Sequence, residues 1–218
     1  MLAQPADKPV TLPTRDRILG SAERLFAQYG YDGVSLRQIG AAACAQIALI
    51  NYHFGTKDQL YRAVFERRIA PVSERRRATL AIALAEQPRP SLRAVLDALA
   101  RPWIEMRGTP EGRDYTRLIA REVNDPREAD RGIVADLLDP IAREFIAAIE
   151  QALPGHAKAD IHWAYLSFMG TLLVVLANPE RITRLSGALF EGQSDDAVVE
   201  RLTGFVERAL RPDAEDQR

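Results

Sequence analysis

The chain has 218 residues, 47% of them hydrophobic, and a formal net charge of −1. This length and composition supply enough apolar side chains for a core, so they exclude a disordered or fibrous chain. No apolar run approaches the ~20 residues of a membrane span, and the first residues lack a signal-like apolar segment, so we expect a soluble, cytoplasmic protein with no membrane partner.

The cysteine content also restricts the chemistry. The single cysteine, Cys44, excludes an internal disulfide. One thiol cannot by itself build a metal site, so zinc and redox chemistry have little support. We predict no cofactor and no metal.

The charge is unevenly divided along the chain. Residues 1–77 hold 12 Lys and Arg against 7 Asp and Glu, whereas the remaining 141 residues hold 17 against 23. The basic first third is therefore the part expected to meet a polyanion. The alternative is that solvated helix faces differ by chance.

Apolar residues recur at helical spacing almost throughout, with Gly and Pro between the periodic segments, which predicts an all-α fold of about nine helices. Residues 1–13 and 213–218 are expected to be tails. The first helix is expected to have Thr14 as its cap and to stop at Gly30. Its inward face is predicted to hold Ile18, Ala22, Leu25, Phe26 and Tyr29.

Two short helices follow. Ser35 is expected to cap the second helix, with Leu36 and Ile39 inward. The third is expected over residues 46–54, with Ile50 and Phe54 inward and Ile47 as a further candidate for the inward face. Gly55 closes this helix, and Thr56 and Gln59 have the spacing of a capping box for a long fourth helix.

The sequence predicts three short helices within about forty residues, and about four residues join the second to the third. These lengths are typical of a helix-turn-helix. The run "ILGSAERLFAQYGYDGVSLRQIGAAACAQIALINYHFGTKDQLYRAVF" resembles the N-terminal DNA-binding domain of the tetracycline-repressor (TetR) family of bacterial transcription regulators. The resemblance covers about Arg15 to Phe65 and rests on "A-x-x-L-F-A-x-Y-G-Y", "S-L-R-Q-I" and "N-Y-H-F-G-T-K-D-Q-L-Y". It implies a DNA-binding domain over residues 14–62 and a ligand-binding and dimerisation domain over residues 63–212.

The resemblance also implies roles for individual residues. Tyr52, His53 and Lys57 are expected to contact phosphates, which set the register on DNA. Asn51 is the candidate for a bidentate contact to adenine, and Arg37 for reading guanine. The other residues of the predicted DNA-binding surface are Gln46, Ile47, Ala48 and Leu49. Ile47, Ala48 and Leu49 are expected to touch thymine methyl groups or to fill space. Sequence specificity should therefore depend mainly on Arg37, Asn51 and DNA shape.

Two residues depart from the family pattern at the turn. Cys44 stands where family members usually carry Gly, the residue favoured at positive φ. Gln46 stands where Ser, Thr or Asn would cap the helix better. The turn therefore either adopts a different backbone or tolerates about 1 kcal/mol of strain at each site. We interpret Cys44 as a thiol that fills a small space, with a redox switch as the less favoured alternative.

Beyond residue 57 the pattern predicts a helical regulatory domain. Helices are expected over residues 57–85, 91–107, 113–123, 129–153, 159–177 and 195–210. Pro71, Pro102 and Pro140 fall inside periodic stretches and are expected to bend their helices, which can open a cavity. The run "ERRRA", residues 74–78, is interpreted as a solvated face.

Large apolar residues and two arginines are the candidates for an effector pocket. The apolar residues are Trp103, Met106, Tyr115, Leu118, Trp163, Phe168 and Met169. The alternative for each is an ordinary residue of the hydrophobic core. Arg117, Arg121 and Glu122 share a helix with apolar residues, and burial of any of them would require pairing or a ligand anion.

Residues 159–177 and 195–210 are predicted to form the interface of a homodimer, as the family resemblance implies. A dimer lets two recognition helices reach half-sites roughly one helical turn apart, ~34 Å or more. The resulting expectation is a repressor that binds a double-stranded palindromic operator and is released when a small, largely hydrophobic effector binds.

Two other classes of protein are the alternatives. An enzyme would need a catalytic cluster, but His156, Asp160 and His162 match no motif with a mechanism, so we predict that the chain is not an enzyme. A DNA-binding architectural protein without an effector would show little specificity and no cavity.

Overall fold

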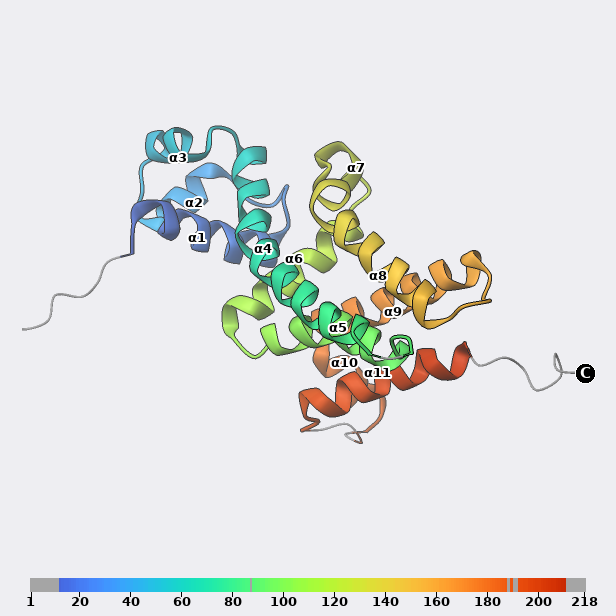
Figure 1. Cartoon of the computed structure of the whole chain (residues 1–218). Helices are drawn as coiled ribbons and strands as arrows, with labels where there is room; N and C mark the ends of the chain where they lie inside the picture. The colour runs from blue at the N-terminus through green and yellow to red at the C-terminus, as the bar shows by residue number, and fades with distance from the viewer. Residues whose placement is uncertain (1–11, 87, 188, 190–191, 211–218) are drawn as a thin grey trace, which may run out of the picture. The chain divides into compact units, whose positions relative to one another are not determined.

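The computed structural model describes residues 12–86, 88–187, 189 and 192–210. Within them lie eleven α-helices, one π-helical segment and no strand (Figure 1). The predicted all-α fold class is therefore confirmed. The chain divides into two compact units, residues 1–64 and 65–218. Both predicted tails lie outside the described residues, apart from Leu12 and Pro13, which are not helical.

The first unit contains helices α1 (Thr14–Tyr29), α2 (Leu36–Ala43) and α3 (Ile47–Phe54) and the start of α4 (Lys57–Leu84). An eight-residue helix such as α3 is marginal in isolation, so its neighbours must hold it. Ile50 and Phe54 are buried, as predicted, and α3 packs against both α1 and α2.

The predicted caps at Ser35 and Thr56 and the predicted stop at Gly30 are confirmed. The Ser35 hydroxyl accepts from the backbone N–H of Gln38 at 3.2 Å, while the Gln38 side chain accepts from the N–H of Ser35 at 2.8 Å. Thr56 and Gln59 make the same reciprocal pair at 3.2 and 2.8 Å. Gly30 ends α1 with a φ of 74°.

Two expectations for α1 are wrong. The N–H groups of Asp16 and Arg17 bond to the carbonyl of Pro13, so the helical ladder begins one residue earlier and Thr14 lies inside the helix rather than capping it. Tyr29 is exposed because it is the last helical residue and the chain turns at Gly30.

The second unit is a bundle built around α9. It contains the rest of α4, then α5 (Leu92–Met106), α6 (Pro110–Val123), α7 (Glu128–Arg131), the π-helical segment η1 (Val134–Leu138), α8 (Asp139–Ala152), α9 (Lys158–Ala177), α10 (Pro179–Leu185) and α11 (Asp195–Ala209). Helix α9 packs against α5, α6, α8, α10 and α11, and α5 also packs against α11 and α8.

The helix expected over residues 129–153 is wrong, because three elements occupy that stretch. Gly132, with a φ of 64°, ends α7, and its N–H bonds to the carbonyl of Glu128. Pro140 lies in the first turn of α8, where its missing N–H breaks no helical bond, so it begins a helix instead of bending one. Pro71 and Pro102 do lie inside α4 and α5.

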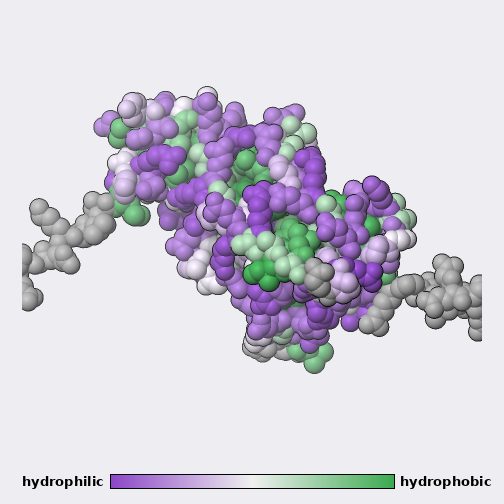
Figure 2. Space-filling view, viewed as in Figure 1, coloured by the Kyte–Doolittle hydropathy of each residue, from purple (hydrophilic) through white to green (hydrophobic). Residues whose placement is uncertain are grey.

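Among the described residues, α9 alone has the length and apolar composition that a membrane crossing requires. Core helices of soluble proteins have the same properties, and α9 packs against five other helices. The surface in Figure 2 is mostly hydrophilic, with hydrophobic residues gathered in a few patches.

Candidate nucleic-acid interface and effector cavities

The turn between α2 and α3 is built on a left-handed residue. Cys44 has φ 48° and ψ 49°, and it is the one non-glycine residue with positive φ in the described part of the chain. The turn therefore keeps the left-handed backbone at which family members usually carry Gly, and Cys44 tolerates the resulting strain. The thiol is exposed, so the interpretation that it fills a small space is wrong. Arg17 Nε supports the turn by donating to the Ala43 carbonyl at 3.3 Å.

Gly40 allows the close approach of the chain at this turn. A Cβ at Gly40 would lie 2.7 Å from the carbonyl oxygen of Ala45, and the Ala45 N–H bonds to the Gly40 carbonyl at 2.9 Å. Gly40 was not among the residues predicted for the turn. Its signal was a glycine in the middle of a short helix, where glycine is unfavourable unless a backbone comes close.

Helix α3 exposes a mixed face. Gln46 is its N-cap residue and makes no side-chain capping bond. Ile47 is 43% exposed, so it does not join the inward face. The exposed residues of this face are Gln46, Ile47, Ala48, Leu49, Asn51 and Tyr52. An apolar stripe followed by an amide and a phenol is the surface that the sequence placed toward a DNA groove.

Tyr52 is the most exposed aromatic residue in the described part of the first unit. Its side chain is 82% exposed, and its ring meets the ring of His53 edge to face with centroids 5.2 Å apart. His53 is half-buried, whereas Arg37 is exposed on α2.

The first turn of α4 carries a positioned cation. Lys57 Nζ lies 4.1 Å from the centre of the Tyr31 ring, whose hydroxyl donates to Asp58. A helix N-terminus and a lysine together favour an anion. Arg15, which the sequence analysis did not single out, stacks its guanidinium 5.2 Å from the centre of the Phe54 ring at the end of α3.

The second unit contains a partly open cavity of about 110 Å³. Of the predicted effector residues, Trp103 and Met169 line it. The other lining residues are Arg76, Ile119, Val123, Val134, Leu138, Asp139, Ala142, Tyr165, Leu173 and Leu176. They come from α4, α5, α6, η1, α8 and α9, so the cavity lies within the bundle.

Arg76 is the one polar side chain of this wall that is fully buried, with 2% of its surface exposed. The expected solvated face at "ERRRA" is therefore wrong for this residue, although Arg75 and Arg77 are exposed. Its guanidinium carbon lies 4.7 Å from the centre of the Phe145 ring and 5.7 Å from that of Trp103. Burial lowers the pKa of Arg76 to about 10, against the opposing effects of the Tyr165 hydroxyl and the Glu144 carboxylate.

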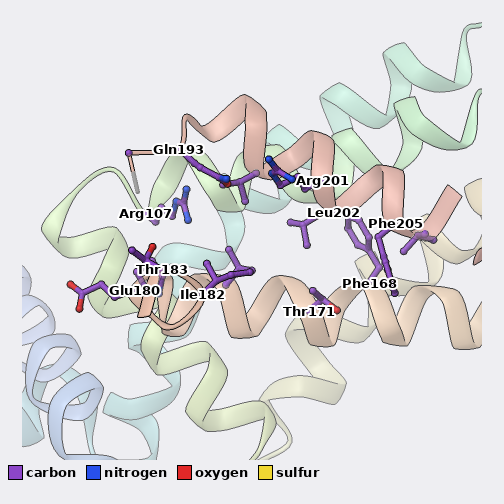
Figure 3. Close-up of a pocket in the computed structure, with 15 residues that line it drawn as sticks. Arg107, Phe168, Thr171, Glu180, Ile182, Thr183, Gln193, Arg201, Leu202 and Phe205 are labelled. Carbon is purple, nitrogen blue, oxygen red and sulfur yellow. The ribbon is translucent and has the colours of Figure 1, made fainter. Parts of the chain in front are cut away.

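A larger, half-open groove of about 550 Å³ lies between α9, α10 and α11 (Figure 3). Phe168 and Leu202 point into it from facing helices, and Phe205 lies beside Phe168 (Figure 3). Arg107 and Arg201 add positive charge to its wall. Phe168 is thus brought to a different space from Trp103 and Met169.

The remaining predicted effector residues lie elsewhere. Trp163 is exposed on α9 and Met106 is half-buried at the end of α5. Arg117 is exposed and pairs with Asp114 at 3.5 Å, and Arg121 is also exposed. Neither arginine lines the two spaces described above. Tyr115 and Leu118 are fully buried core residues.

Glu122 is buried and paired, as the sequence analysis required of a buried charge. Arg131 donates to its two oxygens at 2.8 and 2.9 Å, and also contacts Asp125 at 3.0 Å. This pair joins α7 to the end of α6.

Of the candidate enzymatic cluster, His156 and Asp160 line one surface pocket together, whereas His162 does not line it. His156 Nε2 lies 3.0 Å from the carbonyl oxygen of Leu210, and His162 Nδ1 lies 2.8 Å from that of Lys158. No group of three metal-ligating side chains occurs among the described residues.

A short helix-turn-helix with an exposed recognition face, joined to a helical bundle that contains cavities, defines a class of two-part DNA-binding regulators. Residues 18–64 match the family model of the tetR family of bacterial regulatory proteins, and residues 97–208 match that of the tetracyclin repressor-like C-terminal domain. The chain belongs to the TetR family of transcriptional regulators.

Individual relatives resemble parts of the chain. It is 37% identical over 68 residues to the HTH-type transcriptional repressor AcnR of Corynebacterium efficiens, which is 31% of this chain and 35% of AcnR. It is 34% identical over 94 residues to the repressor NicS of Pseudomonas putida, which is 43% of this chain and 41% of NicS. The chain thus spans less than half the length of the curated relatives it matches.

Solved structures agree over nearly the whole chain. The fatty acid degradation regulator FadR from Bacillus halodurans superposes with a TM-score of 0.67 at 15% identity, covering 92% of this chain and 98% of that one. A TetR-like regulator from Rhodococcus sp. RHA1 gives 0.65 at 20% identity, with the same coverage. At these identities the likeness establishes the fold.

Proposed function

We propose that this protein is a cytoplasmic, homodimeric transcriptional repressor that binds a palindromic DNA operator and is released when a small, largely hydrophobic effector binds its second unit. The observation that carries the proposal is the exposed face of α3, from Gln46 to Tyr52, presented on a packed helix-turn-helix. The names of AcnR and NicS as repressors favour repression over activation.

The face of α3 has two kinds of side chain for DNA. Asn51 and Arg37 carry the amide and guanidinium groups that read adenine and guanine in the major groove. Tyr52, His53 and Lys57, at the end of α3 and the start of α4, supply donors for phosphates. Ile47, Ala48 and Leu49 offer only apolar contact, so base discrimination rests on few residues and on DNA shape.

A dimer is supported by an exposed apolar face on α9. Trp163, Leu166, Gly170 and Val174 follow helical spacing, and all four are exposed. A Cβ added at Gly170 would meet no atom within 4 Å. Exposed apolar surface of this kind marks protein interaction sites, and the adjacent Phe205 on α11 extends it.

Helix α4 offers a route for the response. Its first turn carries Lys57 and its later turns carry Arg76 in the cavity wall. An effector that binds one arrangement of the bundle better than another shifts the population of states, and only such a difference in affinity changes operator binding.

The proposal is tested by selecting duplexes from a random library with the full chain, and then measuring fluorescence anisotropy on a selected and a random duplex at several salt concentrations. Specific binding leaves a clear ratio between the two affinities, whereas nonspecific binding is almost wholly salt-dependent. Asn51→Ala is expected to cost ~1–3 kcal/mol on the selected duplex alone. Lys57→Ala should weaken binding to both duplexes and lower the salt dependence by about one phosphate contact.

Tyr29→Ala is the matched control for Tyr52→Ala, because both tyrosines are exposed in the first unit but Tyr29 lies outside α3. Loss of affinity in Tyr52→Ala with retention in Tyr29→Ala supports the assigned surface. Wild-type affinity in both Asn51→Ala and Tyr52→Ala contradicts it.

A further inference from the structure

The wall of the 110 Å³ cavity combines an apolar lining with a buried positive charge. Ile119, Met169, Leu173 and Leu176 form apolar parts of the wall, and Arg76 enters it from α4. A buried guanidinium needs hydrogen-bond acceptors for its donors, because a buried charge without partners is unfavourable.

Several of these donors have no acceptor among the described residues. Arg76 Nε and Nη2 and Trp103 Nε1 are buried without a hydrogen-bond partner. All three belong to residues that line the same cavity.

The nearby carboxylates do not supply what Arg76 lacks. Glu144 is held by Arg77, which donates to its two oxygens at 2.8 to 3.0 Å. Asp139 lies at the cavity wall, but its side chain is 44% exposed and pairs with Arg143 at 3.4 Å. The hydroxyl of Tyr165 interacts with Arg76, but it is neutral and offers one oxygen. No ion pair joins Arg76 to a carboxylate in the part of the chain that the structure describes.

The shape of the guanidinium selects the chemistry of a partner. Its planar fork matches two oxygens of a carboxylate through parallel hydrogen bonds. The aromatic faces of Phe145 and Trp103 pack near the guanidinium, which leaves its edge as the hydrogen-bonding side. A volume of about 110 Å³ is of the order that holds one small ring.

We propose that the effector is a small carboxylate with a compact apolar body, whose carboxylate accepts hydrogen bonds from Arg76 and Trp103 while the body fills the apolar part of the cavity. This assignment rests on the proposed function, since it names the class of compound that regulates DNA binding. The groove in Figure 3 is the less suitable site for such a ligand, because it is about five times larger and lies between the helices proposed for the dimer.

The carboxylate is tested on the wild-type chain with pairs of isosteric probes. Calorimetry is run with benzoate and benzamide, then with hexanoate and hexanamide. Each acid is expected to bind at least about tenfold more tightly than its amide, because the amide has one acceptor and no charge. This comparison needs no variant, so it does not depend on how substitutions fold.

Arg76→Met tests the receptor. It removes the charge while keeping a long apolar side chain, and is expected to weaken benzoate at least about tenfold while leaving benzamide little changed. Arg75→Met is the matched control, since Arg75 is the preceding residue of the same helix but is exposed. Trp103→Phe removes one donor and is expected to weaken benzoate about threefold or more.

Equal binding of acids and amides overturns the inference, and so does unchanged benzoate affinity in Arg76→Met. Failure of benzoate and of every straight-chain acid from acetate to octanoate to bind at about 10 mM also overturns it. Operator anisotropy, with and without benzoate, separates the two proposals. If the chain binds benzoate through Arg76 but binds no duplex, only the proposed function is contradicted. If it binds DNA specifically but binds no acid, only this inference is contradicted.

Discussion

At the scale of single residues, Cys44 holds a conformation that disfavours its own side chain. A non-glycine residue in the left-handed region costs about 1–2 kcal/mol. Cys44→Gly removes that cost, but adds backbone freedom to the unfolded chain. The expected net result is a gain of about 0.5–1 kcal/mol in the free energy of unfolding, measured by urea denaturation.

Cys44→Ala separates the backbone from the thiol, because alanine keeps the Cβ and loses the sulfur. It is expected to leave the free energy of unfolding near the wild-type value, since the thiol is exposed. A gain in Cys44→Ala as large as in Cys44→Gly would show that the thiol, not the φ of 48°, is the source of the cost.

The residue scale also shows what was predictable from sequence. Capping by Ser35 and Thr56 depends on a motif of four residues, so the local sequence predicted both caps correctly. Three arginines in a row gave no local sign that Arg76 alone is buried. Its burial depends on where α5, α8 and α9 pack, which is information from residues far along the chain.

At the scale of elements, the Glu122–Arg131 pair fixes a short helix. Helix α7 has four residues and no buried side chain of its own. The Glu122 side chain is fully buried and that of Arg131 is 10% exposed, so the pair is largely desolvated. Arg131→Met is expected to cost about 3–5 kcal/mol in urea denaturation, because it leaves a buried carboxylate without its guanidinium.

Arg127→Met is the control for this substitution, because Arg127 is an exposed arginine next to the same helix. Its expected cost is within about 0.5 kcal/mol. The double variant Glu122→Leu with Arg131→Met should recover part of the loss, since it removes the buried charge as well as its partner. A cost for Arg131→Met no larger than for Arg127→Met would contradict this role.

The Arg77–Glu144 pair joins α4 to α8 and predicts a pH dependence. The hydrogen bond from Arg77 lowers the pKa of Glu144 below 4.5 in the folded chain. The folded state therefore binds this proton more weakly than the unfolded state, so the pair stabilises the fold above pH 4.5 and loses that effect as the pH falls through the lower folded pKa. Glu144→Gln is expected to cost up to about 1 kcal/mol at pH 7, because the pair is partly exposed.

The difference between wild type and Glu144→Gln should shrink as the pH falls below 4.5. Glu150→Gln is a control on the same helix, since its oxygen lies 4.0 Å from Lys158 and makes a weaker pair. Urea denaturation across this pH range checks both variants, and a difference that grows toward acid would contradict the direction of the pKa shift.

Element boundaries were predictable where a cap or a glycine marks them, as at Gly30 and Ser91. They were not predictable over residues 129–153, where the apolar period continues through Gly132 and the π-helical segment. A single glycine inside a periodic stretch is compatible with a continuous helix. The φ of 64° at Gly132, which the structure gives, shows that the helix ends there.

At the scale of the whole molecule, family membership and the all-α class were the firmest predictions from the sequence, because both rest on patterns spread over many residues. The candidate DNA-binding residues lie within about twenty positions, so one motif brought them together. The cavity draws on six elements from α4 to α9, and the sequence analysis named two residues that line it, Trp103 and Met169. Sites assembled from distant segments need the packing itself.

The proposed dimer depends on the exposed apolar face of α9. Phe205 is 60% exposed on α11 and lines a surface pocket with Trp163, which belongs to the apolar face of α9. If two copies bury this face, Phe205→Asp places a charge in it and should shift the chain from dimer to monomer in sedimentation velocity. The monomer should then bind a palindromic duplex about 100-fold or more weakly, while its affinity for a single half-site stays the same, because linking two heads raises affinity without new contacts.

Ile82→Asp is the control, because Ile82 is an exposed apolar residue near the end of α4, and the substitution should leave the dimer intact. A Phe205→Asp chain that remains dimeric would place the interface on another face.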